Sequence, residues 1–521
     1  MRSTFFGLET ARKALHAQKK ALDTTSHNIS NANTEGYTRQ KVSMSATNPY
    51  TKPAMNSPTG AGQIGTGVEV TDIERMRDDF IDQQVRQESR FMGDWEAKSD
   101  TLKKLEVIYN EPSEEGLRGV FDRFWESLQT LSQEPESRTS RTEVMERGVS
   151  LADTVNHMYR QMTDLKQDLD DTIRNKVNDI NSIGRQVADL NKQIQNIERA
   201  QGQSANDLKD KRDLLLDELS ELTNFQRAED SDGNLIVSVG GTALVRADSM
   251  NEMRFEQSSP EDIEEGDLDI QEPEGGKVVW EHTGSEINFR DGEMKGLFDS
   301  RDEIVQDQIN ELREVMYQFQ SKFNQVHSGE DDDDTDAFNH YATMDDPEGK
   351  VEDGETFFDW LNNGDELMQV DDDIREDVFN IRAGRETGEE GKYPGNGENA
   401  KLLAQLKHEQ VIDESYYQKY QEADHIDDIE ADGTSTFNDF INATVTSLGV
   451  EAQEAERMVE NQNDLLNQLK NRREAVSGVS LDEEMTNMIK YQQAYNAASR
   501  MVTTIDEQLD TIINRMGIVG R

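Results

Sequence analysis

The chain has no cysteine among its 521 residues. Disulfide bonds, thiolate metal sites and thiol nucleophiles are therefore excluded. No stretch approaches the roughly 20 apolar residues that span a bilayer, so we expect no membrane insertion. The first twenty residues also lack the apolar core and the small-residue cleavage site of a secretory signal. If the protein works outside the cell, we expect it to be exported without a cleaved signal.

Basic residues are scarce. Lysine and arginine number 55 against 107 aspartates and glutamates, which gives a formal net charge of -52. This surface repels nucleic acid, so we expect no nucleic-acid partner, and it repels itself unless dissolved salt screens it. Apolar residues are also few, at 33% with a mean hydropathy of -0.87. Because a single core rarely grows past about 250 to 300 residues, we expect several domains with thin or shared cores.

Catalytic signatures are missing as well. The sequence contains no HExxH pair, P-loop or GxSxG elbow, and no pair of carboxylates stands out as general acid and base. The histidines fit no metal-binding spacing and are expected at the surface. They are His16, His27, His157, His282, His327, His340, His408 and His425. We therefore predict that the protein is not an enzyme and needs no cofactor and no metal.

Three short patterns suggest ligand sites only weakly. Residues 60–65 match the dinucleotide pattern GxGxxG, but Val68-Glu69-Val70 follows where a helix is required, so a loop is predicted. Asp331 to Asp334 with Asp336 could attract calcium, yet the ligand spacing, central glycine and final glutamate of an EF-hand are missing. A solvated acidic loop is favoured at residues 331–336, and calcium binding is the alternative. At residues 230–233 a turn is favoured, again with calcium binding as the alternative.

Both ends of the chain carry apolar helical seams. At the amino end the seam recurs every seven residues, at Leu8, Leu15, Leu22 and Ile29. At the carboxyl end nine uncharged positions alternate steps of three and four: Met488, Tyr491, Tyr495, Ala498, Val502, Ile505, Leu509, Ile512 and Met516. Ser480 and Glu483 form a capping box, which predicts a helix from Leu481 to Met516. Taken alone, the carboxyl-terminal seam favours an ordinary core helix or a coiled-coil dimer. Because a matching seam lies at the other end, we predict that both seams are assembly interfaces.

Between the seams the pattern changes several times. Pro135 is expected to separate two helices, and the longest amphipathic stretch runs from Val155 to Ile197. Alternating apolar residues on either side of Gly240-Gly241 predict a β-hairpin. The segment from Tyr37 to Gly67 is expected to be extended or loop, and 304–326 helical. The fold class is therefore mainly α with a β-rich middle (α+β), with terminal coiled-coil or bundle layers formed by both chain ends.

This pattern divides the chain into segments. Residues 1–48 and 476–521 are the two halves of an inner helical domain, and 49–225 and 396–475 form a helical bundle domain. Residues 226–327 form a middle domain with a β-hairpin and a following helix, and 328–395 are an acidic insertion that is expected to be partly flexible. The two ends are expected to be frayed in the monomer and to fold on assembly, because isolated short helices are marginal.

Four segments resemble a known family. The run ALDTTSHNISNANTEGYTRQKV, residues 21–42, resembles the amino-terminal motif shared by flagellar rod, hook and hook-associated axial proteins. Residues 65–86 (GTGVEVTDIERMRDDFIDQQVR), 124–145 (FWESLQTLSQEPESRTSRTEVM) and 473–517 (beginning REAVSGVSLDEEM) resemble the hook-associated protein 1 (FlgK) family. The resemblance extends over most of the chain except roughly 328–395.

The resemblance implies a secreted structural protein at the hook-filament junction of the bacterial flagellum. The terminal helices would form the innermost layer of a hollow tube, and export would use the flagellar type III apparatus. The implied partners are the hook protein, the third hook-associated protein, neighbouring copies of the chain and a flagellar export chaperone. Two alternatives stay open: a hook or rod protein of the same superfamily, and a secreted calcium-binding adhesin or enzyme on a flagellar scaffold.

Overall fold

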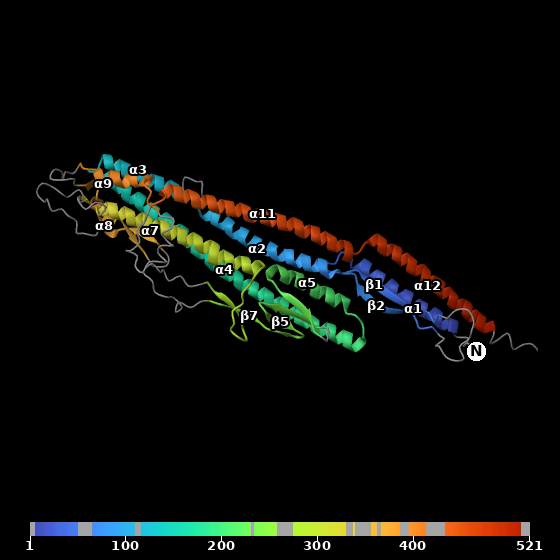
Figure 1. Ribbon diagram of the computed structural model, residues 1–521. Coiled ribbons are helices and arrows are strands. Elements are labelled where there is room, and N and C mark those ends of the chain that lie inside the picture. The colour runs from blue at the N-terminus through green and yellow to red at the C-terminus, as the bar shows by residue number, and fades with distance from the viewer. Residues whose placement is uncertain are drawn as a thin grey trace, which may run out of the picture.

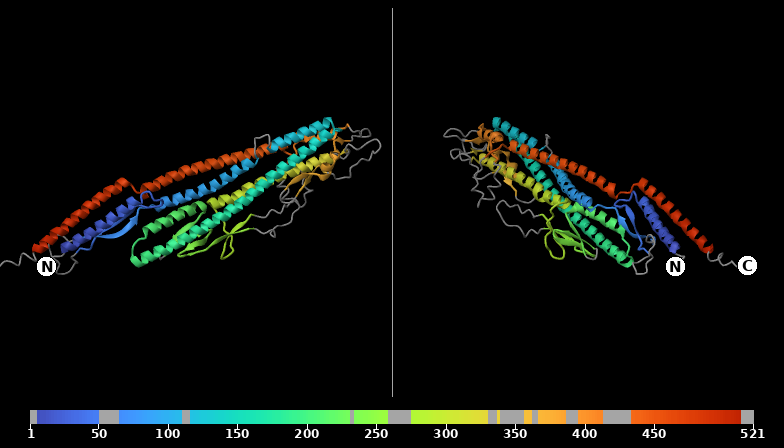
Figure 2. Two further views of the ribbon diagram at one scale, coloured as in Figure 1. Left: turned by 180° about the vertical axis from the view of Figure 1, so that it is seen from behind. Right: turned by 45° about the vertical axis from the view of Figure 1, so that its right-hand side comes forward.

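A computed structural model describes residues 6–49, 65–109, 116–230, 234–257, 275–329, 337–338, 356–361, 366–385, 395–412 and 433–511. The molecule is long and slender (Figures 1 and 2). The first helix, α1 (Phe6–Ser30), and the last, α12 (Leu481–Asp510), pack side by side at one end. The middle of the chain forms the rest of its length. Both chain ends thus enter one helical unit, as the two seams predict.

A β-hairpin covers one side of α1. Strands β1 (Gln40–Ala46) and β2 (Val68–Arg75) pair antiparallel, from Gln40 opposite Arg75 to Ala46 opposite Val68, with a bulge at Ser43/Met44. Both strands contact α1. The predicted extended segment thus contains β1. The chain after residues 60–65 continues into β2 and not into a helix, as expected, and residues 60–64 lie outside the described part.

Next to this unit lies a pair of long helices, α2 (Asp79–Tyr109) and α11 (Phe437–Ser477), which contact each other extensively. Thr436 caps α11, since its side chain accepts a hydrogen bond from the backbone N–H of Asp439. After α11 the chain passes through Gly478 and Val479, and Ser480 caps α12 through the N–H of Glu483. The predicted start of the last helix at Leu481 is confirmed, whereas residues 512–516 of the predicted helix lie outside the described part.

Three further helices complete the bundle: α3 (Leu117–Gln133), α4 (Arg138–Gln201) and α5 (Asn206–Leu222). Pro135 separates α3 from α4, as predicted. The 64-residue α4 contains the whole amphipathic stretch that the sequence indicates, and Gly202, with φ of 60°, ends it in the left-handed conformation that suits glycine.

Small antiparallel sheets lie along α4. The largest has the order β3 (Gln226–Glu229), β4 (Leu235–Val239), β5 (Thr242–Arg246), β6 (Ser249–Met250). Strands β4 and β5 form the predicted hairpin, and the positive φ of Gly240 and Gly241 fits a type I′ turn. A second pair consists of β7 (Met253–Glu256) and β8 (Lys277–Trp280).

A continuous helical run follows: α6 (Glu293–Asp299), one π-helical stretch, η2 (Ser300–Val305), and α7 (Gln306–Ser328). Short elements gather at the far end of the molecule. They are β9 (Ala337–Phe338), β10 (Phe358–Trp360), β11 (Met368–Val370), α8 (Asp372–Glu376), η3 (Val378–Asn380), β12 (Gly384–Arg385), α9 (Glu398–Gln405) and η4 (Leu406–His408). Among the helices of the described ranges, none is long and apolar enough to cross a membrane.

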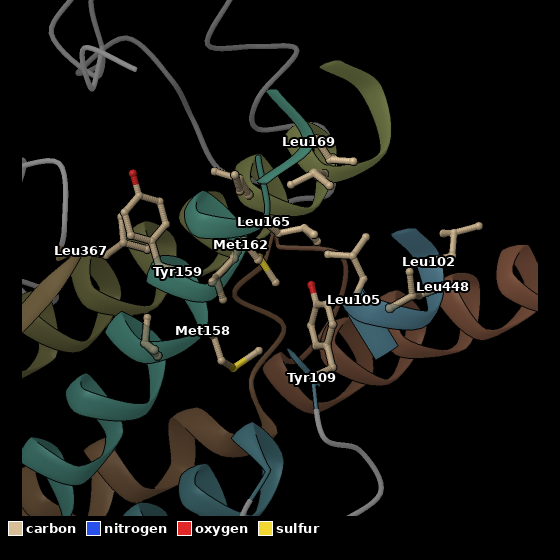
Figure 3. Packing of buried hydrophobic residues seen from close by; sticks show 14 of the residues in the cluster. Leu102, Leu105, Tyr109, Met158, Tyr159, Met162, Leu165, Leu169, Leu367 and Leu448 are labelled. Carbon is tan, nitrogen blue, oxygen red and sulfur yellow. The ribbon is translucent and has the colours of Figure 1, made fainter. Parts of the chain in front are cut away.

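One continuous apolar core joins these elements from α2 to α11. Figure 3 shows Leu105 and Tyr109 of α2 among Met162 and Leu165 of α4. Aromatic rings close the far end, where Phe124, Phe319 and Phe357 are fully buried. Phe357 lies within the segment 328–395. The described part of that segment therefore packs into the same core as α3 and α7 and does not stand apart from it.

Candidate assembly site

The carboxyl-terminal seam lies on the side of α12 that packs against α1. Ala498 and Leu509 are buried, and the other described members, Met488, Tyr491, Tyr495, Val502 and Ile505, are half-buried. Gly7 of α1 approaches closely, because a Cβ at that position would lie 3.2 Å from the Cδ1 of Ile505. Ile512 and Met516 lie outside the described residues. Helix α1 of the same chain thus buries the described part of this seam only partially.

The amino-terminal leucine row does not form the buried side of α1. Leu8, Leu15, Leu22 and Ile29 are all half-buried, and the buried side of α1 is formed instead by Ala11, Ala17, Ala21, Thr24, Thr25 and Asn28. A strict seven-residue repeat drifts by about 20° per heptad on a straight helix, so the row winds along the edge of the contact. The small side chains allow α1 to lie close to α12 and to the hairpin. In the sequence Ala11 and Ala21 stand beside the leucine row, but no pattern there indicated that Ala17, Thr24, Thr25 and Asn28 complete the buried side.

Asn28 is the polar centre of this unit. Its Nδ2 donates to the carbonyl of Gln40 at 2.9 Å and to Glu484 at 3.2 Å. Its Oδ1 accepts from the hydroxyl of Tyr37 at 2.8 Å and from the N–H of Gln40 at 3.0 Å. Burial, and the carboxylates Asp207, Asp210 and Glu484 nearby, raise the pKa of Tyr37, so this hydroxyl stays protonated and donates. One side chain therefore ties α1, β1 and α12 together.

Arg39 holds the start of α12 against the loop after α1. Its guanidinium contacts Glu484 at 3.0 Å and Glu483 at 2.9 Å, and its backbone N–H donates to the carbonyl of Ser477. The first half of the predicted capping box is present, since the Ser480 hydroxyl accepts from the N–H of Glu483. The Glu483 side chain, however, pairs with Arg39. This glutamate joins two segments far apart in sequence.

Four arginines and four aspartates meet where the terminal unit joins the bundle. They are Arg75, Arg77, Arg86 and Arg473 with Asp82, Asp210, Asp213 and Asp217. Asp213 is the most shared: it lies 2.7 Å from Arg75, 3.2 Å from Arg77 and 3.7 Å from Arg86. Burial alone would raise its pKa, but these guanidiniums hold the pKa of Asp213 below its usual value.

The neighbouring Asp210 behaves differently. Burial raises its pKa, and the N–H of Thr38 and the guanidinium of Arg75 offset only part of that effect. The cluster links β2 of the terminal unit to α2, α5 and α11 of the bundle. A hollow of about 420 Å³ opens beside it, lined by residues 32–38 and by α5 and α11.

The weak metal-site patterns of the sequence find no support among the described residues. Within the described ranges no group of three histidines, aspartates or glutamates could hold a metal ion. Asp331 to Asp336 and residues 231–233 of the predicted turn lie outside these ranges, and the Asp230 side chain accepts a hydrogen bond from the backbone N–H of Asn234. The prediction of surface histidines is wrong for His327, which is fully buried and accepts from the N–H of Arg382 at 3.0 Å. Its place at the end of α7 faces the aromatic core, which periodicity alone did not reveal.

Comparison with known proteins identifies the family. Over 555 aligned residues, which include all of both chains, the sequence is 33% identical to flagellar hook-associated protein 1 of Bacillus subtilis. This chain belongs to the flagellar hook-associated protein 1 (FlgK) family. It is therefore a structural component of the flagellar hook-filament junction, outside the cell, and not an enzyme.

Further comparisons agree. The hook-associated protein 1 of Escherichia coli is 24% identical over 97% of this chain and 99% of its own length. The FlgK helical domain matches residues 102–337, the carboxyl-terminal domain of basal body rod proteins matches 474–516, and the basal body rod family matches 8–38. The solved hook junction protein FlgK of Burkholderia pseudomallei shares the fold, with a TM-score of 0.58 and 13% identity over 76% of this chain and 100% of that one.

Proposed function

We propose that copies of this chain form a ring that joins the hook to the filament and is required for filament assembly, with the α1–α12 unit as the assembly element. The hook protein is the partner below and the third hook-associated protein is the partner above. Neighbouring copies are the lateral partners, and an export chaperone accompanies the chain before secretion. The membership of the chain in this flagellar family supports assembly with other flagellar components. The individual partners are those that the sequence resemblance implies.

The observation that carries the proposal is the incomplete burial of the terminal unit. Of the 30 residues of α12 only Glu484, Ala498 and Leu509 are buried, although its seam is apolar throughout. The leucine row of α1 is likewise half-buried. Each methylene that a partner removes from water stabilises a contact by about 0.8 kcal/mol. Stacking of copies would supply that cover, so we propose the residues of both seams as the assembly interface and expect the unit to be only marginally ordered before assembly.

Deletion of residues 481–521 tests this proposal. The truncated chain should keep the bundle from α2 to α11 folded, because the core of that bundle includes no residue of α12. It should fail to enter flagella, and cells that carry it should show hooks without filaments and lose filament protein to the medium. Electron microscopy and immunoblotting of isolated flagella measure both. Normal incorporation of a truncated chain that folds would contradict the proposal.

A further inference from the structure

The last two helices lie along the outside of the molecule as a single layer. Figures 1 and 2 show α11 and α12 following one another along one edge, with α2 and α1 beside them. Helix α11 contacts α2 extensively, and α12 contacts α1 extensively. No other element of the described ranges approaches the backbone of either helix as widely. Each of the two helices therefore depends mainly on one neighbouring helix for its cover.

The far half of α11 is anchored in the core of the bundle. The ring of Phe437 stacks on that of Phe121 in α3 and meets the ring of Phe319 in α7 edge-on. The buried apolar residues of this half all belong to the continuous core, and they are Phe437, Ile441, Leu448, Ala452 and Ala455. Residues 437–455 therefore cannot leave the bundle without opening its core.

The other half of α11 is covered far less. In residues 456–477 Leu466 is the one buried apolar side chain. It packs with Ile81 and Val85 of α2 in a small cluster that is separate from the main core. Gln462, one turn before Leu466, has a buried side-chain oxygen without a hydrogen-bond partner among the described residues. Because an unpaired buried amide oxygen costs stability, this half of the contact with α2 is weak.

Polar contacts hold the rest of this stretch. Arg473 pairs with Asp217 of α5 at 2.6 Å, and Arg39 pairs with the first turn of α12. Only three residues of α12 are buried. Partly exposed ion pairs stabilise a contact far less than apolar burial does. Residues 456–510 are thus held by one small leucine cluster, a few ion pairs and the partial cover of α1.

We propose that residues 456–510 form a strap that opens as one unit while residues 437–455 and the rest of the bundle stay folded. This inference rests on the proposed function and adds a step to it. A copy joins the junction with its strap open, so that α12 can enter between copies that are already in place. The strap then closes on α1 and α2, and the neighbouring copies supply the cover that α12 lacks in the single molecule.

The unequal anchoring of α11 decides where the strap begins. Proteins open locally in cooperative units, and the units with few buried apolar contacts open first. Opening from Glu456 onward exposes one buried leucine of α11. Opening the whole of α11 would in addition expose five core residues and the aromatic stack at Phe437. The boundary between the two halves therefore lies just after Ala455.

Hydrogen exchange of the full-length chain in dilute solution tests the strap. Peptides from 456–510 should exchange at least about tenfold faster than peptides from 437–455. Leu466→Ala should accelerate exchange in 456–510 by about 30-fold or more and leave 437–455 unchanged. Leu448→Ala is the matched control, since Leu448 is 2% exposed in the far half of α11, and it should accelerate exchange in 437–455. Equal protection along α11, or equal acceleration of both halves by Leu466→Ala, would overturn the inference.

A disulfide tests whether opening is needed for assembly, because the chain has no native cysteine. Ile81→Cys with Leu466→Cys ties the strap to α2 when the pair is oxidised. Lys103→Cys with Glu456→Cys is the matched control, since this exposed ion pair at 3.5 Å lies at the edge of the strap and its link leaves residues 457–510 free. The purified proteins are added to cells with bare hooks, and filament growth is scored by electron microscopy.

We expect the oxidised Ile81→Cys, Leu466→Cys protein to be excluded from hooks, and its reduced form and the oxidised control to be incorporated. Incorporation of the oxidised strap variant would overturn the inference. If its reduced form also fails, the exchange pattern of Leu466→Ala decides between an independent strap and a uniform helix. If the unmodified chain itself does not join hooks, the proposed function fails instead, and the exchange pattern still decides whether the strap exists.

Discussion

Replacement of Asp213 by asparagine should loosen the joint between the terminal unit and the bundle. The substitution keeps the shape of the side chain but removes the charge that three arginines share. Loss of one partner from a buried ion pair costs about 3 to 5 kcal/mol. Here each arginine keeps a second carboxylate, Asp210, Asp82 or Asp217, so we expect a smaller cost of about 2 to 4 kcal/mol.

Hydrogen exchange is a suitable assay, because a chain of this size need not unfold in one step. Peptides from α5, which carries Asp213, should exchange roughly 30- to 700-fold faster in the variant if local opening limits exchange, since every 1.4 kcal/mol is tenfold. Peptides from the far part of α4 serve as an internal reference. The surface pair Asp171 and Arg174 gives a matched control. Asp171→Asn should change the free energy of local opening, as derived from hydrogen exchange, by less than about 1 kcal/mol.

The pH dependence of the same variant follows from the lowered pKa of Asp213. A carboxylate whose pKa falls on folding adds stability above its unfolded pKa of about 3.9, and this stability is lost as the pH falls through the folded value. The difference between the two proteins should thus be full at neutral pH and shrink below about pH 4. A difference of less than about 0.5 kcal/mol at pH 7 would refute the view that the cluster holds the joint.

Two further substitutions probe packing and buried charge. Gly93→Ala places a Cβ 2.5 Å from the carbonyl oxygen of Glu221 and 3.0 Å from the N of Glu293, so it should lower stability by about 1 to 3 kcal/mol in thermal unfolding. In Gly449→Ala of α11 the new Cβ meets nothing within 4 Å, so this variant should instead gain up to about 1 kcal/mol of stability. If Gly449→Ala lowered stability more than Gly93→Ala, the packing of α2 on α5 and α6 would be contradicted. Burial raises the pKa of Glu311 above its value in the unfolded chain. The buried carboxylate therefore destabilises the fold at a pH above the folded pKa, and this cost disappears at a pH below the unfolded pKa. Glu311→Gln should therefore raise the melting temperature at pH 8 by an amount that fades toward pH 4, and a lower melting temperature at pH 8 would count against this.

Local features were predictable because they depend on neighbours in the chain. The break at Pro135, the amphipathic stretch from Val155 to Ile197 within α4, the Gly240-Gly241 hairpin and the start of α12 at Leu481 all follow from turn residues, caps and periodicity. The family was predictable too, since its motifs are contiguous segments. The two terminal seams were visible for the same reason.

Burial and long-range pairing needed the tertiary structure. Periodicity marks a helix face as apolar, but it does not say whether Leu15 or Ala17 faces the neighbouring helix, and on α1 the small residues do. The cluster around Asp213 joins residues more than a hundred positions apart, so no local pattern announces it. The segment 328–395 looks like a separate insertion in sequence, yet Phe357 and Phe358 complete the core, because only the folded chain brings α3 and α7 around them.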